Sequence, residues 1–169
     1  MSAYGKRVIV LGGGDTGSDC VGTAIRQKAL SVHQFELMPK PPQERAADNP
    51  WPNWAFILRT SSSHEEGCVR DYSIMTKRFS GENGKLKKLH AVRLQWSKDP
   101  ASGQMKMSEI PGSDFEMACD VVLLAMGFLG PLKCGMLEEL GVALDAVNIE
   151  SIRLIIHSKI LIAFLIRVR

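Results

Sequence analysis

The chain has 169 residues, of which 45% are hydrophobic and 23% are charged, so it is long enough for one globular domain with a sizeable core. The net charge of +3 at pH 7, with no block of like charges, argues against a nucleic-acid partner. Four scattered cysteines without a C-x-x-C pair favour free thiols in a cytoplasmic protein over a metal site or a disulfide framework.

A glycine-rich turn near the N-terminus is the strongest local signal. An apolar run over residues 8–11 predicts a strand buried on both faces, and a helix is expected over 15–28. Between them, Gly12, Gly14 and Gly17 match G-x-G-x-x-G, a spacing typical of dinucleotide sites. The first glycine permits a sharp turn, the second lets backbone approach a pyrophosphate, and the third lets the helix pack closely. The helix N-terminus would add unpaired N–H groups.

A second strand is predicted over residues 31–37, parallel to the first because a helix connects them. Glu36 stands at its end, about 20 residues beyond the glycines, where an acidic residue typically binds the adenosine ribose and favours NAD over NADP. Two alternatives stay open at this point. Glu36 could be a solvated carboxylate, or Lys40 and Arg45 could bind a phosphate there.

The next segments predict loops. Five prolines in residues 38–54 exclude a helix or a central strand, and Trp51 and Trp54 would either anchor this loop or contact a cofactor or partner. Residues 61–67 form a polar connector. It contains Ser, His and Glu, but catalytic triads are assembled in space from distant segments, so adjacency does not indicate hydrolysis.

Short strands and turns follow over residues 72–126. Asn83-Gly84 predicts a hairpin between strands 74–79 and 86–96. After a turn at 98–103, a strand at 105–110 would reverse at Pro111-Gly112 into a returning strand at 115–118. The pattern indicates an antiparallel meander.

An apolar run over residues 120–128 predicts a buried central strand that Gly127 ends. Since ligands bind at the carboxyl edge of parallel sheets, residues 126–130 would share that edge with the glycine turn. Residues 133–140, followed by Gly141, predict a short helix. The expected fold class is α/β, a Rossmann-like NAD(P)H-binding domain with a central parallel sheet and an inserted antiparallel β-meander.

Four motifs in this order resemble one family closely. They are Gly12–Cys20 (GGGDTGSDC), Glu36–Pro42 (ELMPKPP), Asn49–Trp54 (NPWPNW) and Leu123–Pro131 (LLAMGFLGP). Over residues 5–145 the chain is similar to the NAD(P)H domain of two-dinucleotide-binding flavoproteins, and specifically to the small (beta) subunit of glutamate synthase.

The resemblance implies a hydride route. In that family NADH or NADPH on this domain reduces an FAD held by a second dinucleotide fold. Electrons then pass through iron–sulfur clusters to FMN on the large subunit, where glutamate is made. The cofactors carry this chemistry, so we expect an oxidoreductase part without a general acid, a general base or a metal ligand in this chain.

The resemblance also assigns site residues. The pyrophosphate would lie on Gly12, Gly13, Gly14, Asp15, Thr16 and Gly17. Glu36, with Lys40 and Arg45 nearby, would bind the adenosine ribose. Ala125, Met126 and Gly127 would line the nicotinamide–flavin side.

Two departures limit these expectations. The family's cysteine-rich cluster region and first FAD fingerprint would precede residue 1, so the FAD site is incomplete here. After residues 1–145, the apolar tail 146–169 also departs from the family pattern and indicates a truncated or frame-shifted end; its charged residues argue against a membrane span. The alternative function is therefore a non-catalytic nucleotide-binding fragment, or a docking module that lacks the flavin half.

Overall fold

The computed structural model describes residues 2–127, 134–139, 143–144 and 152–153. The chain divides into two compact units, residues 1–126 and 127–169. The predicted boundary at residue 145 and the tail 146–169 lie almost entirely outside the described residues. They therefore stay predictions.

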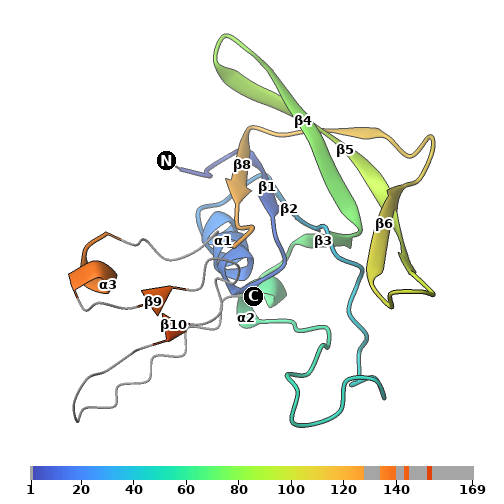
Figure 1. Cartoon of the computed structure of the whole chain (residues 1–169). Coiled ribbons are helices and arrows are strands. Elements are labelled where there is room, and N and C mark those ends of the chain that lie inside the picture. The colour runs from blue at the N-terminus through green and yellow to red at the C-terminus, as the bar shows by residue number, and fades with distance from the viewer. Residues whose placement is uncertain (1, 128–133, 140–142, 145–151, 154–169) are drawn as a thin grey trace. The chain divides into compact units, whose positions relative to one another are not determined.

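A parallel sheet with the strand order β3-β2-β1-β8 is the centre of the first unit. Its strands are β1 (Arg7–Leu11), β2 (Ser31–Glu36), β3 (Val69–Tyr72) and β8 (Val121–Leu124). The helix α1 (Asp15–Arg26) connects β1 to β2 (Figure 1). This order confirms the α/β class and the predicted parallel pair.

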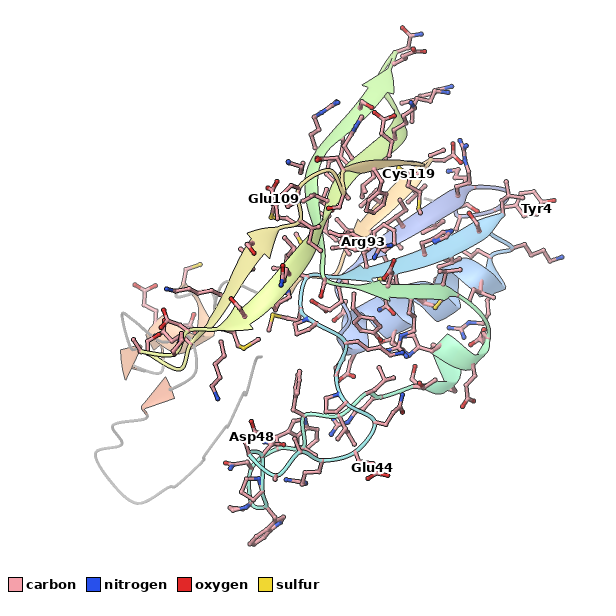
Figure 2. All side chains as sticks on the ribbon, turned by 90° about the vertical axis from the view of Figure 1, so that its right-hand side faces the viewer. Tyr4, Glu44, Asp48, Arg93, Glu109 and Cys119 are labelled. Carbon is pink, nitrogen blue, oxygen red and sulfur yellow. The ribbon has the colours of Figure 1, made fainter. Side chains whose placement is uncertain are left out.

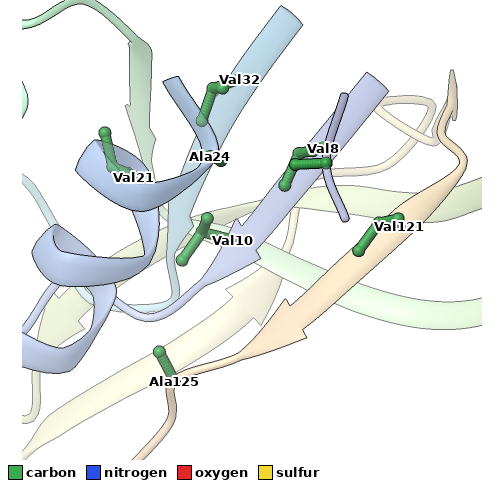
Figure 3. Close-up of a cluster of buried hydrophobic side chains, with 8 residues drawn as sticks. Val8, Val10, Val21, Ala24, Val32, Val121 and Ala125 are labelled. Atoms are coloured by element: carbon green, nitrogen blue, oxygen red, sulfur yellow. The ribbon is translucent and has the colours of Figure 1, made fainter. Parts of the chain in front are cut away.

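One face of this sheet packs against α1. Successive β1 side chains point to opposite faces, and Val8 and Val10 lie on the helical side with Val21 and Ala24 of α1 (Figure 3). All four are at most 2% exposed. Burial of this apolar surface is the main force that fixes α1 to the strands.

A second sheet covers the other face in place of a helix. It contains β4 (Ile74–Glu82), β5 (Lys85–Lys98), β6 (Met105–Glu109) and β7 (Phe115–Ala118). Ile9 and Leu11 of β1 pack there against a buried cluster that includes Leu89 and Cys119. In Figure 2, Cys119 lies between the parallel sheet and the second sheet, and Arg93 lies on the second sheet.

The hairpin prediction is confirmed, because Glu82 pairs with Lys85 across Asn83 and Gly84, which both have positive φ. The predicted reversal at Pro111 is wrong. β6 pairs with residues 94–98 of β5 and β7 pairs with residues 88–91, both antiparallel, so β7 continues in the direction of β6. Between them Ser113 Oγ accepts the N–H of Arg93, which bridges the gap in the ladder.

Three further expectations need correction. The helix α1 ends at Arg26, because Lys28 has a φ of +60° and its N–H and that of Ala29 close a Schellman motif. β8 lies at one end of the described sheet rather than in its centre, and Leu124 is 64% exposed. The connector contains the helix α2 (Ser62–Glu65), and the parallel strand β3 follows it.

In the second unit, the structure describes α3 (Met136–Glu139) and an antiparallel pair of β9 (Ala143–Leu144) and β10 (Ile152–Arg153). The predicted helix over 133–140 is thus described only in its middle, and Gly141 lies outside the described residues. In the parts of the chain described, no helix is long and apolar enough to cross a membrane.

Candidate dinucleotide site

The glycine turn lies where the strand order of the parallel sheet reverses. From β1 the chain continues to β2 and then β3 on one side, whereas β8 lies on the other side of β1. Ligands of open α/β sheets bind beyond the carboxyl ends of the strands at such a point. Residues 12–17 follow directly after β1, so topology alone places them at the expected ligand position.

Gly12 and Gly17 are required by contacts within the protein. Gly12 has a φ of +119°, and a Cβ there would stand 2.0 Å from the carbonyl oxygen of Ala125. A Cβ on Gly17 would stand 2.2 Å from the carbonyl oxygen of Gly12. Both distances are far below a van der Waals contact, so these glycines let α1, β1 and the end of β8 approach one another.

Gly14 differs, since a Cβ there would meet nothing within 4 Å. It is the N-cap of α1 and offers no side-chain cap to the first helical turn. Gly14, Asp15 and Thr16 are all exposed. The open space in front of a helix N-terminus fits an anionic group, because the N–H groups and the helix dipole both favour negative charge.

Glu36 binds the turn itself. Its Oε2 accepts the N–H of Gly13 at 2.5 Å, and its Oε1 accepts the N–H of Met38 at 3.1 Å. The carboxylate is therefore beside the glycine turn at the end of β2, as predicted. Its additional bond to Gly13 was not foreseen.

Two residues that the sequence interpretation missed also reach the turn. Gln34 on β2 is only 2% exposed, and its Nε2 donates to the carbonyl oxygen of Gly12 at 2.9 Å. Its Oε1 is 2.9 Å from Nε2 of His64 on α2. The Ser61-x-x-His64 spacing, which resembles a capping box, could have indicated His64. No such signal indicated Gln34, because its strand also contains the polar residues Ser31, His33 and Glu36.

The two predicted cations are placed differently. Lys40 is exposed on the segment after β2. Arg45 donates to the carbonyl oxygens of Asn49 and Asn53, at 2.9 and 3.0 Å, and so stabilises the proline-rich segment. Figure 2 locates that segment by Glu44 and Asp48. A role of Lys40 or Arg45 at the ribose stays a prediction.

Of the two tryptophans in the same segment, Trp51 is 83% exposed. The guanidinium carbon of Arg59 lies 4.3 Å from the ring centroid of Trp54, within cation–π distance. Trp54 thus has a contact within the loop.

Ala125 and Met126 lie beside the turn. The N–H of Ala125 donates to the carbonyl oxygen of Leu11 at 2.7 Å, which extends the β1–β8 pairing. The Ala125 side chain is buried in the core under α1, whereas Met126 is 70% exposed. Gly127 has a φ of +85° and belongs to the second unit. Their predicted position along the nicotinamide is untested.

No protein-family model matches the chain. It is 46% identical to the glutamate synthase (NADPH) small chain of Mycobacterium tuberculosis over 142 residues, which is 84% of this chain. The corresponding small chain of Bacillus subtilis is 42% identical over 155 residues. This chain is homologous to glutamate synthase small chains.

The homology covers only part of those proteins. The chain spans 28% of the small chain from M. tuberculosis and 31% of that from B. subtilis. It is also 47% identical over 134 residues to the glutamate synthase (NADH) of Saccharomyces cerevisiae, where it spans 6% of the length. All these matches agree with the resemblance seen in the motifs.

A solved structure shows the same fold. M. tuberculosis FprA in complex with NADPH matches 79% of this chain and 41% of its own, with a TM-score of 0.53 at 11% identity. At this identity the likeness concerns the fold alone. It confirms the α/β fold with a central parallel sheet.

Proposed function

We propose that this chain is the pyridine-nucleotide-binding part of a glutamate-synthase-like oxidoreductase, which binds NADH or NADPH for hydride transfer to FAD in glutamate biosynthesis. The proposal rests on the different surroundings of Gly12, Gly14 and Gly17. Protein atoms exclude a Cβ at Gly12 and Gly17, whereas the space at Gly14 is open and faces a helix N-terminus. A pyrophosphate accounts for that open position.

The residues present fit a dinucleotide. The backbone N–H groups of Gly14 and Asp15 would bind the pyrophosphate. Glu36 would accept hydrogen bonds from the ribose hydroxyls, because its carboxylate has lone pairs beyond the two that accept the N–H groups of Gly13 and Met38. When bound, the nicotinamide supplies the hydride. The chain's own contribution is to bind and orient the nucleotide.

The partners belong to the same proposal. The curated relatives are named as chains of glutamate synthase, so we assign a large glutamate synthase subunit and a flavin and iron–sulfur unit as partners of the complete enzyme. Four free cysteines support a reducing compartment, the cytoplasm.

The test is Gly14→Val. The Gly14 backbone lies in the extended region (φ −82°, ψ −172°), which suits a β-branched residue, so the variant is expected to fold normally. The valine would occupy the pyrophosphate space and weaken binding of NADH and NADPH by about a hundredfold or more. Fluorescence titration measures affinity, and circular dichroism measures folding.

Ala101→Val is the control, because it also places a valine at an exposed position, on the turn between β5 and β6. It should leave affinity unchanged. A folded Gly14→Val variant with wild-type affinity would exclude this site.

A further inference from the structure

One peptide unit of the glycine turn is bound at both ends by β2. The Gly12 carbonyl oxygen accepts Nε2 of Gln34 at 2.9 Å, and the N–H of Gly13 donates to Oε2 of Glu36 at 2.5 Å. Gln34 and Glu36 are two residues apart, so they project from the same face of the strand. Glycine restricts its backbone weakly. The orientation of the Gly12–Gly13 peptide therefore depends on these two side chains.

The amide of Gln34 is oriented in turn by His64. The N–H of Ser61 donates to Nδ1 of His64 at 3.2 Å, so Nδ1 is an acceptor and the hydrogen of a neutral ring is on Nε2. This hydrogen is donated to Oε1 of Gln34 at 2.9 Å. Each hydrogen bond in the series Ser61, His64, Gln34, Gly12 therefore has a defined donor and a defined acceptor. Ser61 Oγ also forms a hydrogen bond with Ser18 Oγ of α1.

We propose that Gln34 and His64 are positioning residues for nucleotide binding. A neutral His64 orients Gln34, which together with Glu36 fixes the Gly12–Gly13 peptide in the orientation that presents the turn to a pyrophosphate. This inference rests on the proposed function of the turn.

The surroundings of His64 favour its neutral form. Burial, and secondly the positive charge of Arg70 on β3, lower the pKa of His64 below its ordinary value of 6.5. Arg26 of α1 is paired with Glu66, which follows α2. The β2 side chain that contacts the His64 ring is the uncharged Gln34. Protonation would place a hydrogen on Nδ1, opposite the N–H of Ser61, and would remove that acceptor.

The lowered pKa of His64 determines how pH affects the hydrogen-bond network. The network is intact above the ordinary pKa of a histidine and is weakened as the pH falls through the lowered pKa of His64. Nucleotide affinity should fall with it, by up to about tenfold for each pH unit below that pKa. NAD⁺ is the probe, because its pyrophosphate keeps its charge over this range.

The decisive variant is His64→Gln. A glutamine at this position completes the common Ser-x-x-Gln capping box, so it can accept the Ser61 N–H and donate to Gln34 without titrating. We expect the NAD⁺ affinity of this variant to be within about threefold of wild type at about pH 8. Between about pH 8 and about pH 5, residue 64 should then cause no loss of NAD⁺ affinity. His64→Ala should bind about tenfold more weakly at pH 8.

The control is His90→Gln, at a histidine that bonds Ser80 on the second sheet and does not reach the turn. It should keep the wild-type pH profile, with circular dichroism confirming folding at each pH. An acid loss in His64→Gln equal to that of wild type would overturn the inference, as would wild-type affinity in His64→Ala. A wild-type chain that binds no nucleotide at pH 8 would overturn the proposed function as well.

Discussion

At the scale of single residues, the end of β2 carries two polar side chains with distinct effects on the same turn. Gln34 is buried and neutral, and it acts only within the protein. Glu36 is half-buried and carries the charge that an approaching ribose would meet. We expect a carboxylate at this position to repel a 2′-phosphate, and hence the proposed site to favour NADH over NADPH.

Glu36→Gln tests this charge. The amide oxygen can still accept the N–H of Gly13, so the turn should persist, while the repulsion of a 2′-phosphate is lost. We expect the ratio of NADPH to NADH affinity to rise by about tenfold, as measured by parallel titrations.

Glu44→Gln is the control, because it removes an exposed carboxylate from the proline-rich segment. It should leave the ratio unchanged. A Glu36→Gln variant with the wild-type ratio would show that Lys40 or Arg45, rather than Glu36, determines the choice of nucleotide.

At the scale of elements, helix α1 ends in a strained way. Lys28 has a φ of +60°, and the N–H of Lys28 and Ala29 bond the carbonyl oxygens of Ile25 and Ala24. This Schellman geometry usually has glycine at the left-handed position, since a Cβ there is unfavourable.

Lys28→Gly should therefore stabilise the protein, by about 0.5–1 kcal/mol in the free energy of unfolding, once the greater entropy of the unfolded glycine is subtracted. Denaturant unfolding measures it. Lys98→Gly, at an exposed β5 residue without a positive φ, should instead destabilise. Destabilisation by both substitutions would contradict the strain at Lys28.

The elements also show what the sequence could predict. The unit from β1 to β2 was predictable because its apolar periodicity and its glycines are local signals. β3 was not, since Val69 is 56% exposed and this short strand lacks an apolar pattern. The direction of β7 is defined by its pairing with residues 88–91 of β5, and Ser113 just before β7 bridges to Arg93, 20 residues away. Likewise, the partners of Gln34 lie 22 and 30 residues away, so no spacing rule could connect them.

At the scale of the whole first unit, an ion pair joins the starts of β1 and β8. Asp120 accepts three hydrogen bonds of 2.8–2.9 Å from the backbone and guanidinium of Arg7. The guanidinium of Arg7, and then its backbone N–H, lower the pKa of Asp120 well below its ordinary value of 3.8. The stability from this pair is thus fully present above that value and is lost as the pH falls through the lowered pKa.

Asp120→Asn should lower the midpoint of thermal unfolding by a few degrees at neutral pH, because the bidentate charge-assisted contact is lost. In strong acid, where wild-type Asp120 is itself becoming protonated, the difference should shrink. Scans at both pH values measure this. Asp48→Asn, on the exposed proline-rich segment, should change neither midpoint. A difference that does not depend on pH would exclude a role for the ionised carboxylate.

The pairing of β1 with β8 also dictates when the nucleotide site can form during synthesis. Arg7 and Asp120 are 113 residues apart, and all of β2 to β7 is translated between them. The glycine turn therefore emerges from the ribosome before β2 to β8, and it lacks its neighbour Ala125 until β8 has been made. Contacts of such sequence separation form late and slowly. Until then the apolar face of β1 that the second sheet covers is open to aggregation.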